Sequence, residues 1–126
     1  MLAPRAGYVL LAAVVVAIAF GTMRVFAAPV APDPHAAMST FVDSVNRGDW
    51  GAACRMYSRR YLKVSQAECR RFWWWGRRIF GPYRYVVVRT HRAGDRYHVA
   101  LHCRNQVDFV DFALEADGWK VIAGGW

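Results

Sequence analysis

Few side chains of this sequence have the types and the spacing that catalysis needs. His98 and His102 stand four residues apart on an expected strand, so about 13 Å separates them and they cannot share a metal ion. Asp108 and Asp111 lie on the next expected strand, where either acid could face an apolar interior and abstract a proton from a ligand. The plainer alternative is that both acids face solvent and pair with strand arginines. The sequence has no Ser/His/Asp set, no glycine-rich phosphate loop and no Cys/His spacing for zinc, so we expect neither a cofactor nor a metal site.

Aromatic and cationic side chains gather in the stretch CRRFWWWGRRIFG, residues 69–81, which places three tryptophans between two arginine pairs. On a helix, with about 100° between residues, one apolar stripe forms beside Cys69. This stripe contains Phe72, Trp73, Gly76, Ile79 and Phe80. Trp75 lies at its edge, and Trp74 lies on the opposite side among four arginines, which are Arg70, Arg71, Arg77 and Arg78. We therefore expect Trp73 to be buried and Trp74 to be the most exposed of the three.

Two interpretations of Trp74 and its arginines stay open. The arginines can stack on the indole and shield it, or the N-terminal helix can cover it. Alternatively, these side chains form a protruding face that contacts anionic lipid or a partner protein. Residues 47–78 carry nine basic and two acidic side chains, which favours an anionic partner, although an arginine-rich composition alone would produce the same excess. No nucleic-acid recognition motif is present, so we do not expect sequence-specific binding of nucleic acid.

Residues 1–27 are expected to be a targeting segment rather than part of the fold. An apolar run covers residues 7–23, which suits a signal peptide or an anchor in the cytoplasmic membrane. The following letters VFA fit a signal-peptidase site, but the arginine before them disfavours cleavage, so both alternatives stay open. In either case we expect an exported protein, either anchored with its domain outside the cytoplasm or secreted. Residues 28–33 form a Pro-rich linker, and residues 34–126 form the domain.

Three helices are expected at the start of the domain. The pair Asp33 and Pro34 is typical of a helix N-cap and first residue. Apolar residues then recur with helical spacing at Met38, Phe41, Val42 and Val45. Gly48 ends this helix, Asp49 caps a short second helix that runs to about residue 57, and Ser65 opens the third through a capping box.

After Pro82 the apolar period changes to two residues, which predicts strands. The expected strands cover residues 83–91, 96–104, 106–116 and 119–124. In the third strand the apolar phase slips between Phe109 and Val110. The slip predicts a bulge that leaves Asp108 and Asp111 pointing away from the apolar face. Three helices followed by about four antiparallel strands indicate an α+β fold, with the helices packed on a curved sheet.

The helical layout, with FVDSVNRGDWGAACRMYS early and ADGWKV late, resembles the nuclear transport factor 2-like (cystatin-like) superfamily. It is most similar to the small exported or membrane-anchored members that are common in actinobacteria. The resemblance covers residues 34–122, where Cys54 and Cys69 match two cysteine positions, and Trp119 and Val121 match the closing strand. It implies a cone-like roll, in which a curved sheet wraps a long helix around a cavity.

The superfamily contains isomerases, dehydratases and many non-enzymatic binding domains. Its enzymes place an Asp, His or Tyr inside the cone as a general base or polarising group. The resemblance therefore makes four residues the candidates for catalysis, namely Asp108, Asp111, His98 and His102.

Three cysteines are present, and a pair of them would oxidise in an exported protein. Cys54 and Cys69 fall on inward faces of adjoining helices that a short loop separates. We therefore predict a disulfide between these two residues. Cys103, on the apolar face of its strand, is then expected to stay a buried thiol.

The sequence favours a non-catalytic, exported binding or accessory domain of the cell envelope. One alternative is a small cavity enzyme of the isomerase or dehydratase type, with an Asp and a His inside the cone. Another is an assembly subunit, because one membrane pass before such a domain resembles the bitopic scaffold proteins of secretion and conjugation machines. An open pocket with an inward acid would favour the enzyme. A filled cone with an exposed face around Trp74 would favour binding or assembly.

Overall fold

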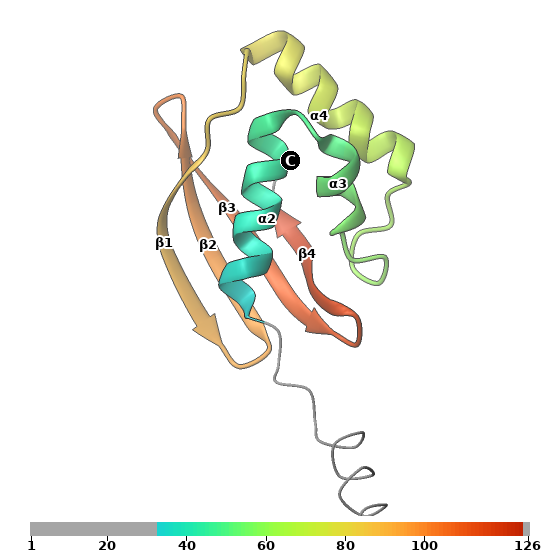
Figure 1. Cartoon of the computed structure of the whole chain (residues 1–126), viewed down its shortest axis with the longest axis vertical. Coiled ribbons are helices and arrows are strands. Elements are labelled where there is room, and N and C mark those ends of the chain that lie inside the picture. Colours follow the sequence, from blue (N-terminus) through green and yellow to red (C-terminus); the bar gives the residue numbers. More distant parts are fainter. Residues whose placement is uncertain (1–32, 125–126) are drawn as a thin grey trace, which may run out of the picture. The chain divides into compact units, whose positions relative to one another are not determined.

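The computed structural model describes residues 33–124, which form three helices and one sheet (Figure 1). The helices are α2 (Pro34–Arg47), α3 (Trp50–Arg55) and α4 (Gln66–Phe80). The strands are β1 (Val86–Ala93), β2 (Arg96–Cys103), β3 (Gln106–Glu115) and β4 (Gly118–Gly124). Neighbouring strands pair antiparallel in the order β1-β2-β3-β4. The predicted α+β class, with three helices before four antiparallel strands, is therefore confirmed.

The predictions for the N-terminal part lie outside the described residues. They concern the targeting segment 1–27 and nearly all of the Pro-rich linker 28–33. Residues 32–126 form a compact unit of their own. Among the helices that lie between residues 33 and 124, none is long and apolar enough to cross a lipid bilayer.

Side-chain caps begin all three helices, as the sequence predicts. The capping residues are Asp33, Asp49 and Ser65, whose side chains accept hydrogen bonds from backbone N–H groups two or three residues further on. Gly48 ends α2 with a φ of 79°, a left-handed conformation that glycine adopts without strain. Because these signals are local, the predicted helix ends lie close to the observed ones. The largest difference is in α3, which ends at Arg55, two residues before the expected end.

The core lies between the helices and one face of the sheet. The apolar face of α2 is buried as predicted, and its residues are Met38, Phe41, Val42 and Val45. Phe41 contacts Phe112 of β3 edge to face, with ring centroids 5.9 Å apart. On β2 the predicted alternation is confirmed by the buried residues Tyr97, Val99, Leu101 and Cys103. Figure 1 shows α2 in front of the sheet.

Strand β3 has no bulge in its pairing with β2, so the predicted bulge between Phe109 and Val110 is wrong. That pairing is unbroken from Gln106 to Ala113. Because successive side chains alternate between faces, Phe109 points away from the face that buries Val110 and is 60% exposed. The slip in the apolar pattern arises because apolar side chains lie on both faces of an unbroken strand. The irregularity between β3 and β4 lies in β4, where Ile122 has no partner in the register.

Helix α4 follows the predicted helical angles only in part. Trp73 is buried as expected, and it and Cys69 are the buried residues of this helix. Trp74 is 44% exposed and Trp75 is 48% exposed, so the expectation that Trp74 is the most exposed of the three is wrong. The predicted apolar stripe is core only in its first half, because its last members lie at the surface, namely Ile79 and Phe80.

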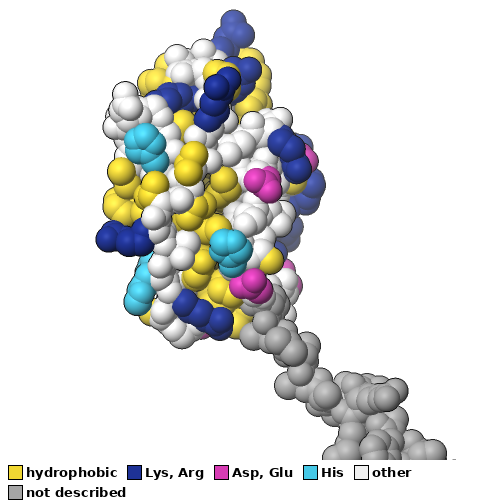
Figure 2. Space-filling model, turned by 60° about the vertical axis from the view of Figure 1, so that its left-hand side comes forward, with side chains coloured by type: hydrophobic (Ala, Val, Ile, Leu, Met, Phe, Trp, Pro, Cys, Tyr) yellow, Lys and Arg dark blue, Asp and Glu magenta, His cyan; other side chains and the backbone are white. Residues whose placement is uncertain are grey.

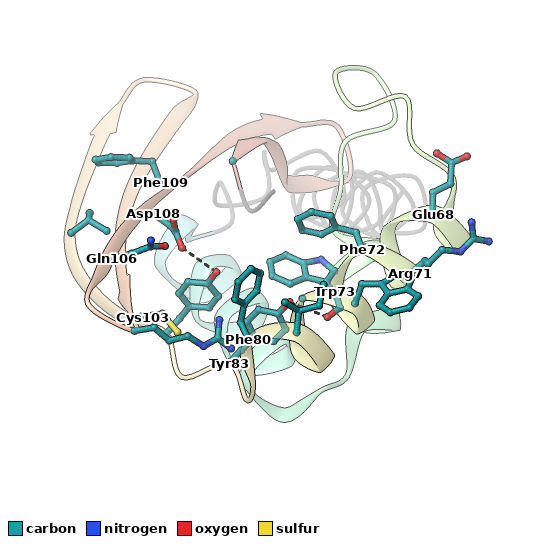
Figure 3. Close-up of a pocket in the computed structure, with 17 residues that line it drawn as sticks. Glu68, Arg71, Phe72, Trp73, Phe80, Tyr83, Cys103, Gln106, Asp108 and Phe109 are labelled. Carbon is teal, nitrogen blue, oxygen red and sulfur yellow. Dashed lines mark hydrogen bonds between the residues drawn. The ribbon is translucent and has the colours of Figure 1, made fainter.

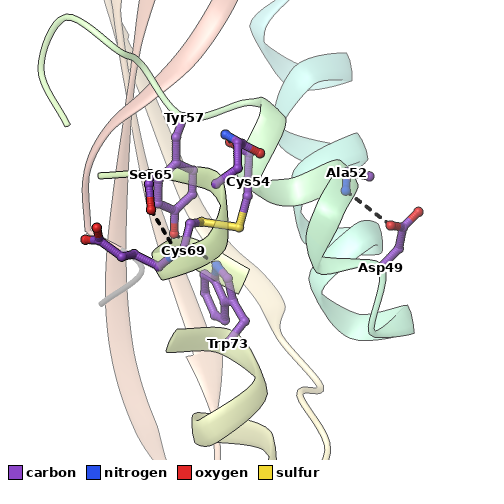
Figure 4. The surroundings of a disulfide bond; sticks show 9 residues. Asp49, Ala52, Cys54, Tyr57, Ser65, Cys69 and Trp73 are labelled. Atoms are coloured by element: carbon purple, nitrogen blue, oxygen red, sulfur yellow. Dashed lines mark hydrogen bonds between the residues drawn. A yellow bond between two sulfur atoms is a disulfide. The ribbon is translucent and has the colours of Figure 1, made fainter. Parts of the chain in front are cut away.

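A disulfide joins Cys54 of α3 to Cys69 of α4, as predicted (Figure 4). The two Cα atoms are 5.9 Å apart, and both cysteines are buried. Figure 4 shows the bond beside Tyr57 and Trp73. The Trp73 indole N–H donates to the Tyr57 hydroxyl over 3.0 Å. Cys103 is a buried free thiol, also as predicted.

Candidate ligand-binding groove

An open groove of about 960 Å³ lies between α4 and strand β3 (Figure 3). Its volume falls in the range of small-molecule sites, about 300–1,000 Å³. One wall comes from residues 68–80 of α4, and the other comes from residues 106–109 of β3. The lining is completed by Tyr83, Tyr85, Cys103, Arg104 and Gly124. The groove therefore lies where the exposed half of the α4 stripe faces the first residues of β3.

Large apolar side chains at the surface concentrate in this groove. Nine such side chains are exposed between residues 33 and 124, and five of them line the groove. These five are Trp75, Ile79, Phe80, Val107 and Phe109. Single apolar residues at a surface are ordinary, but a contiguous group marks an interaction site. Trp75, Ile79 and Phe80 thus form an apolar wall on α4, whereas Val107 and Phe109 project from the other face of β3 at the rim of the groove.

Tyr83 packs closely against α4 in the groove lining. Its hydroxyl donates to the Trp73 carbonyl over 2.9 Å, and its ring meets the Trp73 ring edge to face. A Cβ on Gly76 would lie 1.9 Å from the Tyr83 hydroxyl. Burial, as the largest effect, raises the pKa of Tyr83, so the hydroxyl stays a neutral donor. The glycine in the tryptophan stretch is therefore required for the approach of Tyr83.

Arg104, in the turn after β2, holds the end of α4 in place. Its guanidinium lies over the rings of Phe80, at 5.9 Å, and Tyr83, at 5.2 Å. It also donates to the backbone carbonyls of Gly81 and Pro82. Arg104 adopts a left-handed φ of 53°, which a non-glycine residue keeps only where its surroundings hold it. Sequence reasoning missed this residue, because its partners are brought together only by the fold.

Asp108 is the one predicted acid that lies in the groove. It accepts a hydrogen bond from the Tyr85 hydroxyl over 3.2 Å, and Figure 3 shows it directed inward while Phe109 lies on the other side of β3. The expectation that Asp108 points away from the apolar face is therefore wrong, because β3 is unbroken. Burial first, and then the Asp108 carboxylate, raise the pKa of Tyr85 well above its usual value. Asn46 fixes the Tyr85 backbone through two hydrogen bonds, of 2.8 and 3.0 Å.

The histidine candidates lie on the opposite, exposed face of the sheet. His98 Nδ1 is 2.6 Å from Asp111 Oδ1, and the His98 ring stacks on His91 at 6.3 Å. His102 is also exposed and does not line the groove. The structure thus forms an Asp–His pair, but it lies outside the groove. Within residues 33–124, no three His, Cys, Asp or Glu side chains are placed to hold a metal ion.

The predicted Trp–Arg face is present on the remaining side of α4. The Arg78 guanidinium lies 5.4 Å from the centre of the Trp74 ring, and Trp74 touches Trp75 edge to face. The four exposed arginines of this face, Arg70, Arg71, Arg77 and Arg78, make no salt bridge within the described part of the chain. Arg71 also lines the groove. Figure 2 shows Lys and Arg side chains around the end of the domain where α4 lies.

Comparison with known proteins gives no relative from which a role could be transferred: no protein-family model matches the chain, and no curated protein matches it significantly. The structure combines an open groove that contains an inward acid with an exposed Trp–Arg face. The function is therefore argued from the geometry of these two surfaces.

Proposed function

We propose that this chain is an exported, non-catalytic binding domain of the nuclear transport factor 2-like type, whose groove between α4 and β3 binds an apolar partner. The observation that carries the proposal is the group of exposed, large apolar side chains on the α4 wall of one groove, Trp75, Ile79 and Phe80, with Val107 and Phe109 at its β3 rim. The order of three helices and four antiparallel strands supports the family assignment. In that assignment the groove is the open side of the cone between its helix and its sheet.

Three polar side chains of the groove are already bonded within the chain. Asp108 and Tyr85 are hydrogen-bonded to each other, and Arg104 is bonded to backbone carbonyls. No histidine lines the groove among the described residues. A partner is therefore held mainly by contact with rings and aliphatic side chains, which stabilise binding through the area they remove from water.

Titration with an uncharged phenylnaphthylamine tests the binding role, because its fluorescence rises in apolar surroundings. Phe80→Ser should weaken its binding by about tenfold, since most of one buried ring contact is lost. Val88→Ser is the matched control, because Val88 is 56% exposed and lies outside the groove. An equal effect of both substitutions, or no binding to the wild type, would contradict the proposal.

A second candidate function is a cavity enzyme, which the Asp108–Tyr85 pair favours. A carboxyl group beside a tyrosine can act as the base that removes a carbon-bound proton while the tyrosine hydroxyl polarises a carbonyl. Such an enzyme would exchange a proton of a cyclic ketone with solvent deuterium, and Asp108→Asn would abolish that exchange. Exchange that is absent from the wild type, or that survives the substitution, would count against catalysis by this pair.

The Trp–Arg face supports a further role at the envelope, in which Trp74 and its arginines contact anionic lipid. Residues 7–23 would hold the chain at the cytoplasmic membrane if they are not cleaved, and an assembly role in a secretion or conjugation machine would use the same face toward an envelope protein. Co-sedimentation of residues 32–126 with phosphatidylglycerol vesicles tests the lipid contact. Arg70→Glu and Arg77→Glu should reduce it, whereas the same changes with neutral vesicles should have no effect.

A further inference from the structure

Two histidines of neighbouring strands form a pair on the exposed face of the sheet. His91 of β1 and His98 of β2 are direct partners in the antiparallel register. Directly opposed residues have their side chains on the same face, with Cβ atoms about 4.5–5.5 Å apart. The two imidazole rings are nearly parallel, with an interplanar angle of 12° and centroids 6.3 Å apart. Both side chains are exposed, so a dissolved ion can reach the pair.

Asp111 of β3 holds one of these rings in a defined state. It stands opposite His98 in the register between β2 and β3, and its Oδ1 is 2.6 Å from His98 Nδ1. Because a carboxylate only accepts hydrogen bonds, Nδ1 carries the proton of the neutral ring and Nε2 keeps a free lone pair. Metal-binding histidines are commonly oriented by such a bond from the second ring nitrogen to a carboxylate. Within residues 33–124, no hydrogen bond or ion pair engages the ring nitrogens of His91.

We propose that His91 and His98 together bind one divalent transition-metal ion, and that Asp111 orients His98 without touching the ion. Bonds from the ion to imidazole nitrogens are about 2 Å long, which places it about 3 Å from each ring centroid. Centroids 6.3 Å apart are therefore within the span of one bridging ion, once rotation about the side-chain bonds of His91 directs its nitrogen inward. Water completes the coordination, because the described chain offers no third side-chain ligand.

The charges around the pair select the class of ion. Two arginines, Arg89 and Arg96, stand two residues before the histidines on the same face of the sheet. Asp111 is the acid that is bonded to the pair. Calcium and magnesium ions need several oxygen ligands, which this surface does not supply. Imidazole nitrogens suit Cu²⁺, Ni²⁺ and Zn²⁺, and Cu²⁺ binds a given site most tightly of the three.

The pair could not be found from spacing along one strand. His98 and His102 are four residues apart on β2 and too distant to share an ion, whereas His91 belongs to another strand and only the register places it opposite His98. The pair lies on the face of the sheet opposite the groove. The inference is therefore independent of the proposed binding function.

Titration of the full chain with Cu²⁺ tests the site. The heat of binding measures the affinity, and pulsed EPR counts the imidazole nitrogens coupled to the ion. The wild type should bind one ion through two imidazoles. His91→Ala and His98→Ala should each weaken binding at least about tenfold and leave one coupled imidazole. Asp111→Asn should keep both imidazoles coupled and weaken binding about 10–100-fold.

His102→Ala is the matched control, because His102 is exposed on the same strand and face but stands opposite Val86 and Val107. It should leave the affinity and the number of coupled imidazoles unchanged. None of the four substituted side chains is buried, so metal-free unfolding of each variant should match that of the wild type. Adding Cu²⁺ should raise the unfolding midpoint of the wild type and of His102→Ala, but not that of His91→Ala.

Three results would overturn the inference. If the wild type does not bind Cu²⁺, or binds it without coupled imidazoles, the site does not exist. If either His91→Ala or His98→Ala keeps the full affinity, the ion is held elsewhere on the chain. If Asp111→Asn keeps the full affinity, Asp111 does not orient a metal ligand. Binding of phenylnaphthylamine in the groove is measured separately, and it should not change when Cu²⁺ is added.

Discussion

Adjacent tryptophans of α4 have opposite environments, and this contrast gives the first prediction at the scale of residues. Trp73 is 2% exposed and Trp74 is 44% exposed. Trp73→Ala should lower the free energy of unfolding by about 3–5 kcal/mol, because it leaves a cavity in the core. Trp74→Ala should change it by less than about 0.5 kcal/mol. Urea unfolding of both variants measures this, and equal destabilisation would contradict the packing of α4.

Gly76 gives a prediction whose sign depends on a second residue. Replacing a glycine inside a helix with alanine normally stabilises the helix by about 1 kcal/mol. Here the new Cβ would lie 1.9 Å from the Tyr83 hydroxyl, so Gly76→Ala should destabilise the domain. In a Tyr83→Phe background the hydroxyl is gone and the nearest ring carbon is 3.2 Å from the new Cβ, so Gly76→Ala should destabilise the domain much less than in the wild type. A double-mutant cycle of unfolding free energies measures the coupling, and strictly additive effects would argue against this contact.

Tyr57 makes stability fall at alkaline pH. Burial raises the pKa of its hydroxyl above the usual value of 10.0, so the folded chain keeps this proton when the unfolded chain loses it. The contribution to stability is complete below pH 10 and is lost as pH rises further. Tyr57→Phe should flatten that fall, while costing about 1–3 kcal/mol near neutral pH because the Trp73 N–H loses its acceptor. Unfolding at several pH values tests this, and an unchanged alkaline slope would contradict it.

At the scale of elements, the disulfide between α3 and α4 should be a main source of stability for the helical half. Cys54 and Cys69 are separated by 15 positions, and closing such a loop stabilises by about 3 kcal/mol in the chain-entropy model. The double substitution Cys54→Ala and Cys69→Ala should therefore lower the unfolding free energy by about that amount. Cys103→Ala is the control, and peptide mapping without reductant should show Cys103 unlinked. A disulfide that includes Cys103 would contradict this pairing.

Features that depend on nearby residues in the sequence could be predicted. Features that depend on packing against other elements could not. The caps at Asp33, Asp49 and Ser65 and the stop at Gly48 fix the helices from within. The alternation of β2 is also local, because one whole face of this strand is covered. In β3, however, apolar residues lie on both faces, because Val110 and Phe112 point to the core while Val107 and Phe109 are exposed on the other face. A helical angle or a strand period gives the direction of a side chain, but it does not show whether another element covers that side chain.

The same limit applies to the candidate site. Asp108 was among the predicted residues, but its partner Tyr85 comes from the connection after α4, which has no recognisable spacing to β3. Arg104 and Gly76 were overlooked as site residues for the same reason, because their roles depend on Tyr83. The signal that could have located the groove was a surplus of apolar residues in α4 and β3. The same surplus also predicts a buried stripe in α4 and a bulge in β3, so the pattern alone does not distinguish a groove from the core.

At the scale of the whole molecule, α4 carries two surfaces, an apolar one and a basic one. The net charge of the chain is +8, and the arginines of α4 add to it on one side of the helix, while the other side lines the apolar groove. Arg71 belongs to both surfaces. A partner in the groove would therefore lie beside a basic face, and acidic groups that flank its apolar part should raise its association rate in a salt-dependent manner.

The central claim is that the groove between α4 and β3 is the binding site, and methyl NMR tests it most directly. Ile79 lies on the α4 wall of the groove, Val107 lies at its β3 rim, and Val88 lies outside it. When phenylnaphthylamine is titrated into the methyl-labelled chain, the methyl signals of Ile79 and Val107 should shift together and show Overhauser contacts to the probe. The Val88 signals should stay in place. Shifts at Val88 without shifts at Ile79 and Val107, or no shifts at all, would contradict the account.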